Sequence, residues 1–267
     1  MRMARIKFLS AALTAALLLA IGSAARAAIK TEAVTYKEGH AEAHSFIVYD
    51  DTVSGKRPGV LVVPEWWGLN DYPRMRAKML AQLGYVAMAV DIYGDGKVTA
   101  DPKQAGAWAD ALEAGDRAEL RTRIAAALAK LKSDPRVDAS KTAAIGYCFG
   151  GSTVLELARS RAEVNGVVSF HGHYDTADPA KPGEVKARIL ACHGADDPFT
   201  SAAQIQAFED EMRKAGADWQ FNVYGGAKHS FTNPDAGKYH VATLAYNEEA
   251  DHRSWQAMKD FFREIFK

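Results

Sequence analysis

The sequence predicts an α/β fold in which a mostly parallel sheet carries helices on both faces. Short apolar runs rich in valine, such as residues 59–63, are typical of strands that are buried on both sides. These runs alternate along the chain with longer segments whose apolar residues recur at helical spacing. Such alternation produces parallel strands joined by right-handed helical crossovers. The chain shows no internal repeat and no low-complexity linker, so we expect a single domain over residues 28–267.

The predicted elements follow one another in a regular order. The strands are expected at residues 43–49, 59–63, 85–90, 142–145, 166–170, 189–192 and 219–224. A first helix over residues 73–83 stops at Gly84, and an Ala-rich stretch from Asp101 to Leu131 is expected to form two helices that break near Gly115. Three further helices are expected at residues 152–159, 202–215 and 247–266.

The first 27 residues have the pattern of a secretory signal peptide. Basic residues precede an apolar run over residues 8–21, and small residues follow, ending in Ala25-Arg26-Ala27. The alternative is a membrane anchor, but the run is shorter than the roughly 20 residues that span a bilayer. We therefore expect cleavage after Ala27 and export to the periplasm or the medium. Ala28 rather than a cysteine follows, which argues against lipid anchoring.

The charge of the remaining chain limits its partners. Residues 28–267 carry 29 basic and 33 acidic residues, a formal net charge of −4. A mildly acidic surface lacks the basic patch that nucleic-acid binding needs. No second apolar stretch is long enough to span a membrane. We expect a small-molecule substrate, no nucleic-acid partner, no membrane association after cleavage, and a monomer.

The two cysteines, Cys148 and Cys192, would reside in a compartment that permits disulfides. A single disulfide is one interpretation. However, each cysteine ends or follows a predicted core strand in its own Gly-flanked motif, and a domain of this size has little need of a cross-link. We expect two free thiols.

A Gly-rich turn around Cys148 is the first candidate for chemistry. The segment Gly146-Tyr147-Cys148-Phe149-Gly150-Gly151 lies between a predicted strand and a predicted helix. A nucleophile in a tight strand-to-helix turn needs small neighbours, as in the G-x-S-x-G elbow, here with sulfur in place of oxygen. The following helix N-terminus favours a thiolate, and the backbone N–H of Phe149 would stabilise an oxyanion. The alternative is a turn whose cysteine only packs.

An acid and a histidine follow two later strands. Asp196 and Asp197 come after the strand at residues 189–192, and His229 comes after the strand at residues 219–224. The aspartates could simply form a turn, and the histidine could be a solvated loop residue. However, nucleophile, acid and histidine in this order, each after its own strand, is the chain order of α/β-hydrolases. The sequence therefore predicts a catalytic triad that needs no cofactor.

The chain resembles the dienelactone hydrolase family, the carboxymethylenebutenolidases, from about residue 37 to residue 266. The resemblance rests on the Cys148 turn and on four further motifs: Val63-Pro64-Glu65-Trp66-Trp67-Gly68-Leu69-Asn70, Asp91-Ile92-Tyr93-Gly94, Gly194-Ala195-Asp196-Asp197-Pro198-Phe199 and Gly226-Ala227-Lys228-His229-Ser230-Phe231. It implies an α/β-hydrolase that cleaves an ester or enol-lactone without a cofactor. The acid of the triad is then Asp197, which directly precedes Pro198-Phe199, and the triad is Cys148, Asp197 and His229.

The resemblance also implies roles for two residues after the strand at residues 59–63. In the family, a glutamate at the position of Glu65 contacts the cysteine in the resting enzyme and moves away when the substrate binds. The backbone N–H of Trp66 would be the second donor to the oxyanion. A surface acid and a core-covering aromatic are the alternatives for these two residues.

The sequence departs from the family where the substrate carboxylate is bound. Dienelactone hydrolases hold that carboxylate with arginines, but the corresponding segments read Gly94-Asp95-Gly96-Lys97 and Thr232-Asn233-Pro234. Lys97 could supply a charge without the bidentate geometry of arginine. The substrate is therefore open, with a thioesterase or a general carboxylesterase as alternatives. A non-catalytic envelope binding protein is a further alternative, for which a broken triad would be expected.

A short His-rich segment follows the strand at residues 166–170. His171, His173 and Asp175 lie close together, but their spacing is not that of a familiar metal site. We predict no metal, and we expect His171, which follows a strand end, to line the cleft.

Overall fold

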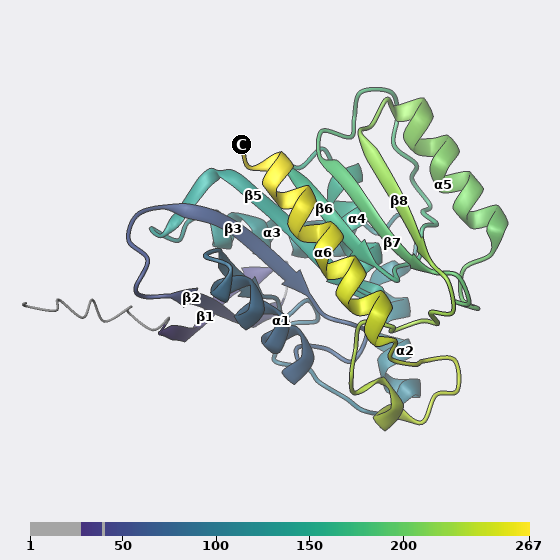
Figure 1. Ribbon diagram of the computed structural model, residues 1–267, viewed down its shortest axis with the longest axis horizontal. Helices are drawn as coiled ribbons and strands as arrows, with labels where there is room; N and C mark the ends of the chain where they lie inside the picture. The colour runs from purple at the N-terminus through teal and green to yellow at the C-terminus, as the bar shows by residue number, and fades with distance from the viewer. Residues whose placement is uncertain (1–27, 39–40) are drawn as a thin grey trace, which may run out of the picture.

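The computed structural model describes residues 28–38 and 41–267, so the predicted signal peptide lies outside the described residues (Figure 1). Its centre is an eight-stranded sheet in the order β1-β2-β4-β3-β5-β6-β7-β8. Strand β2 runs antiparallel to its neighbours β1 and β4, and all other pairs are parallel. The strands are β1 (Ile29–Glu38), β2 (Ala41–Asp50), β3 (Arg57–Val63), β4 (Val86–Ala89), β5 (Val137–Tyr147), β6 (Gly166–Phe170), β7 (Arg188–Gly194) and β8 (Trp219–Tyr224).

Helices cover both faces of the sheet and enclose two apolar cores. Along β3, Leu61 and Val63 face one core, whereas Val60 and Val62 face the other. This alternation explains why the strand reads as a continuous apolar run. In Figure 1, α6 and α1 cross the near face, and α3 and α4 lie behind the sheet. The helices are α1 (Asp71–Gln82), α2 (Pro102–Glu113), α3 (Ala118–Lys132), α4 (Phe149–Arg159), α5 (Ala202–Ala215) and α6 (Glu248–Ile265), with a short 3-10 helix η1 (Ala236–Tyr239).

The predicted fold class is confirmed, and the largest difference concerns the first strand. Residues 29–38 form a ten-residue strand that pairs with β2 along its whole length. This strand was not predicted, because an edge strand with mostly exposed side chains lacks an apolar pattern. By contrast, the predicted bounds of α5 agree with the structure. That helix begins with a capping box of Ser201 and Gln204 and ends at Gly216 in the left-handed conformation.

The topology brings several loops together at one edge of the sheet. The chain passes from β3 to β4 on one side and returns to β5 on the other side of β3. Such a switch point opens a crevice at the carboxyl ends of the parallel strands. The loops that follow β3, β5, β6, β7 and β8 therefore meet there. None of the described helices is long and apolar enough to cross a membrane.

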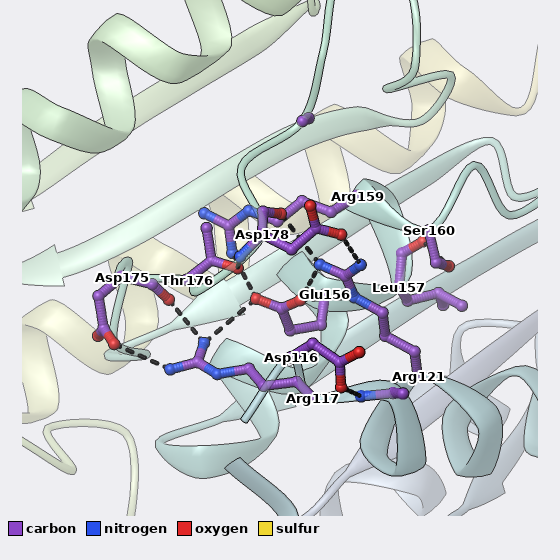
Figure 2. Close-up of polar contacts among 12 residues, drawn as sticks. Asp116, Arg117, Arg121, Glu156, Leu157, Arg159, Ser160, Asp175, Thr176 and Asp178 are labelled. Carbon is purple, nitrogen blue, oxygen red and sulfur yellow. Dashed lines mark hydrogen bonds and ion pairs between the residues drawn. The ribbon is translucent and has the colours of Figure 1, made fainter. Parts of the chain in front are cut away.

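A buried charge network fixes the loop after β6 against the helices (Figure 2). Glu156 of α4 is fully buried and forms ion pairs with Arg117 at 3.2 Å, Arg121 at 2.7 Å and Arg159 at 3.0 Å. Arg117 also binds both the carbonyl and the carboxylate of Asp175, which lies in the loop after β6. Because each guanidinium has several acceptors, the charge of Glu156 is compensated within the core.

This network leads to a stability prediction. Glu156→Gln keeps the shape of the side chain but leaves buried arginines without their shared anion, so we expect the free energy of unfolding to fall by about 3–5 kcal/mol. Urea denaturation measures the loss. The control is Asp210→Asn, which breaks an exposed pair with Arg213 and should cost less than about 1 kcal/mol. Equal losses of unfolding free energy in the two variants would contradict the role of Glu156 as the anion shared by the buried arginines.

Candidate active site

Cys148 lies at the turn between β5 and α4 in a conformation that few non-glycine residues adopt. Its φ is 54° and its ψ is −120°. The flanking glycines make this turn possible, because a Cβ on Gly146 would lie 1.9 Å from the carbonyl oxygen of Gly150. A Cβ on Gly150 would lie 2.4 Å from the carbonyl oxygen of Val63 at the end of β3. The N-terminus of α4 is thereby packed directly against the loop that follows β3.

His229 and Asp197 are brought together from the ends of two neighbouring strands. His229 Nδ1 lies 2.7 Å from Asp197 Oδ2, and both side chains are buried. The other carboxylate oxygen of Asp197 accepts a hydrogen bond from the backbone N–H of Phe199 at 2.9 Å, which fixes its orientation. Burial raises the pKa of Asp197, but the hydrogen bond and charge of His229 outweigh it, so the pKa is lowered.

Cys148 and His229 line the same small cavity. Its volume is about 60 Å³, and its lining residues are Trp66, Cys148, His173, Phe199, His229 and Leu244. Burial lowers the pKa of His229, but the charge of Cys148 and the hydrogen bonds to Asp197 and Cys148 outweigh it and raise the pKa to about 10. The arrangement thus favours a protonated imidazole beside the sulfur.

Two backbone N–H groups are free beside Cys148. Neither Phe149 N nor Trp66 N donates a hydrogen bond to any residue that the structure describes. Tyr93 supports both residues, because its hydroxyl donates to the Trp66 carbonyl at 3.1 Å and its ring stacks on Phe149 at 5.5 Å. Two free N–H groups held in this way are what an oxyanion requires.

Glu65 differs from the expectation that it contacts Cys148. Its two carboxylate oxygens accept hydrogen bonds from Ser230 Oγ and Asn233 Nδ2, both at 2.6 Å. No hydrogen bond joins it to Cys148 among the described residues. Burial raises the pKa of Glu65 despite these two donors. In this conformation Glu65 therefore anchors the loop that carries His229 and does not restrain the thiol.

Lys97 does not replace the missing arginines at the cavity. It pairs with Asp95 at 3.4 Å and lines a separate hollow together with Tyr93 and Trp108. Arg76, which lies deep in the core, is bound to Asp251 and to the carbonyl oxygen of Thr232. Within the described part of the chain, no lysine or arginine lines the cavity above Cys148.

The sequence did not indicate several residues that shape the site. Leu244 lies in the long loop before α6, and no pattern around it predicts a position at the cavity. Tyr93 and Phe199 belong to two of the family motifs, but the sequence alone gives no role for their side chains. His173 lines the cavity, whereas His171 is fully buried behind it, and Asp175 is bound to Arg117. The expectation that Cys148 and Cys192 are free thiols is confirmed.

Comparison with known proteins finds similar sequences and similar structures. Residues 44–266 match the model of the dienelactone hydrolase family. A Synechocystis protein described as "Putative carboxymethylenebutenolidase" is 27% identical over 254 residues, which cover 90% of this chain and 98% of that protein.

Two solved structures are also similar. One, described as "m3DLH", is 44% identical with a TM-score of 0.85, and the match covers 90% of this chain and 99% of the other. The second is a dienelactone hydrolase-like promiscuous phosphotriesterase from metagenomic libraries. It is 42% identical with a TM-score of 0.84, and the match covers 90% of this chain and 100% of the other.

The pair of His229 and Asp197 should make stability depend on pH. The charge of Cys148, followed by the hydrogen bond to Asp197, raises the pKa of His229 from 6.5 to about 10, so the charged His229 stabilises the fold fully below pH 6.5 and less as the pH rises through about 10. Because the pKa of Asp197 is lowered from 3.8, its contribution is lost only as the pH falls below that value. We expect Asp197→Asn to lower the free energy of unfolding by about 3 kcal/mol near pH 5.5 and by clearly less above pH 10. Urea denaturation at both pH values tests this, and equal losses would contradict it.

Proposed function

The chain belongs to the dienelactone hydrolase family and has the α/β-hydrolase fold, and from that premise we propose that it cleaves carboxylic esters or lactones with Cys148 as nucleophile. The observation that carries the proposal is the 2.7 Å contact between His229 and Asp197, with His229 and Cys148 in one cavity. The order of these three residues along the chain agrees with it.

The acylation step follows from the charges at the site. The Cys148 thiolate, stabilised by the His229 imidazolium and the N-terminus of α4, attacks the carbonyl carbon. The carbonyl oxygen becomes negative and accepts hydrogen bonds from Phe149 N and Trp66 N, each worth about 10²–10³ in turnover. When the tetrahedral intermediate collapses, the ester C–O bond breaks and the leaving alkoxide takes the proton of His229.

The deacylation step returns the enzyme to its starting state. His229 is then neutral, because the thioester sulfur no longer carries a charge. Its imidazole takes a proton from a water molecule, and the resulting hydroxide attacks the thioester carbonyl. The carboxylic acid leaves, the thiolate re-forms, and Asp197 keeps the imidazole in the tautomer that this step requires.

The lining of the cavity supports an uncharged substrate. Trp66, Phe199 and Leu244 supply apolar surface, and no lysine or arginine offers a partner for a substrate carboxylate among the described residues. Burial, followed by the charge of His229, lowers the pKa of His173, so this ring is neutral near pH 7. Asp197 and the thiolate add negative charge nearby. The preferred substrates are therefore neutral esters, thioesters or lactones, rather than dienelactone itself.

A phosphotriester is a second candidate substrate. The similarity to a promiscuous phosphotriesterase at 42% identity favours it. A phosphotriester is also uncharged, and attack by Cys148 on phosphorus with loss of an aryloxide develops the same negative oxygen for Phe149 N and Trp66 N to hold.

The nucleophile can be tested directly. We expect Cys148→Ala to lower the hydrolysis of p-nitrophenyl acetate by at least about 10³-fold, because the covalent step is lost. Cys148→Ser should retain a measurable fraction, since a hydroxyl in the same turn is a weaker nucleophile. Circular dichroism controls for folding. Wild-type turnover by Cys148→Ala would refute the proposal, and the same variants assayed with a dialkyl aryl phosphate test the second candidate.

The preference for neutral substrates can be tested with a matched pair. p-Nitrophenyl butyrate and p-nitrophenyl hemisuccinate share a leaving group and a similar acyl length but differ by one carboxylate. We expect kcat/KM to favour the neutral ester by about tenfold or more, because an anion entering the cavity stays unpaired. Phe199→Arg should narrow the ratio, whereas Phe199→Gln, the uncharged control, should not. If kcat/KM for the two esters were nearly equal in the wild type, the proposed preference for neutral substrates would be wrong.

A further inference from the structure

His171 lies directly behind the nucleophile but has no place in the mechanism above. It follows β6 and is fully buried, and its φ of 41° is unusual for a non-glycine residue. Its Nδ1 accepts a hydrogen bond from the backbone N–H of Cys148 at 3.1 Å. Its Nε2 lies 2.7 Å from Thr232 Oγ1. One ring therefore joins the turn that carries Cys148 to the loop that carries His229.

The contacts of Thr232 extend this connection to helices α1 and α6. The hydroxyl of Thr232 lies 2.6 Å from that of Tyr72 in α1. Arg76, one turn further along α1, donates to the Tyr72 hydroxyl at 3.3 Å and to the Thr232 carbonyl at 2.5 Å. The same guanidinium binds Asp251 of α6 at 2.6 Å. Thr232 is thus held at both its hydroxyl and its carbonyl.

The hydrogen bonds determine the tautomer of His171. A backbone N–H can only donate, so Nδ1 must be unprotonated and the neutral ring carries its proton on Nε2, which donates to Thr232. Burial, followed by the charge of His229, lowers the pKa of His171 well below 6.5 and keeps the ring neutral. A neutral ring is also required because the rings of His171 and His229 are only 5.2 Å apart, where a second positive charge would oppose the imidazolium.

We propose that His171 is a positioning residue, which sets the separation of the Cys148 sulfur and the His229 imidazole by tying the Cys148 backbone to Thr232. This rests on the proposed role of Cys148 as nucleophile. The backbone of Cys148 is strained, and its N–H is shared between the Phe170 carbonyl at 3.0 Å and His171 at 3.1 Å. Loss of the second acceptor frees the turn to move away from the loop that carries His229.

Two variants of nearly equal shape separate this role from simple packing. The Oδ1 of His171→Asn can replace Nδ1 as acceptor, whereas His171→Leu fills similar space without an acceptor. Alkylation of Cys148 by iodoacetamide, followed by mass spectrometry from pH 5 to 10, measures the thiolate without any substrate. We expect His171→Leu to slow alkylation at pH 6 by about tenfold, because the sulfur moves away from the imidazolium that favours its thiolate. His171→Asn should stay within about threefold of the wild type.

The outcomes are distinct. Equal alkylation profiles for His171→Leu and His171→Asn would overturn the proposal, as would a wild-type profile for His171→Leu. If His171→Leu does not fold, Thr232→Val and Thr232→Ser provide the second pair, and only Thr232→Val should shift the profile. Cys192, which is buried with a pKa raised to about 12, serves as the unreactive internal reference. Failure of the proposed function would appear separately, as ester hydrolysis that survives Cys148→Ala.

Discussion

The close approach of α4 to the end of β3 is the constraint on which the rest of the site depends. Gly150 lies so near the Val63 carbonyl that no side chain fits between them. This contact forces the turn before α4 to be tight, and the tight turn places Cys148 in a strained conformation with its sulfur at the cavity. It also brings the N–H of Phe149 beside the loop of Trp66. The same glycines therefore allow α4 to pack against β3 and place the two N–H groups that could bind an oxyanion.

The strain at Cys148 is resisted from both faces of the sheet. On one face, Arg76 of α1 holds Asp251 of α6 and the loop with Thr232. On the other face, Glu156 forms ion pairs with Arg117, Arg121 and Arg159, and this cluster fixes the loop after β6 (Figure 2). Each cluster contains a buried carboxylate whose charge is met by guanidinium groups, an arrangement that defines geometry more than it adds stability.

The sequence predicted the parts of this structure that local physics determines. The Val-rich run of residues 60–63 predicts a strand between two layers, and Gly146 and Gly150 predict a tight turn around Cys148. The contacts of Glu65, Thr232 and Leu244 could not be predicted in this way. Their partners lie far away along the chain or in loops without a periodic pattern. Glu65 shows the limit most clearly, since a carboxylate after a strand could reach either the thiol or the hydroxyl of Ser230, and only the packed structure selects Ser230.

The site therefore divides into a fixed part and a variable part. The N–H groups, the imidazole and the thiol are held by backbone packing and buried hydrogen bonds, so a change in any of them disturbs the others. The side chains of Phe199 and Leu244 line the cavity and form no hydrogen bonds, and Phe199 is 44% exposed. Substitutions of the Phe199 side chain change the cavity wall but retain the backbone hydrogen bond that Phe199 donates to Asp197. A scaffold built in this way can retain its chemistry while its substrate changes, so the proposed neutral substrate is compatible with the fold of the family.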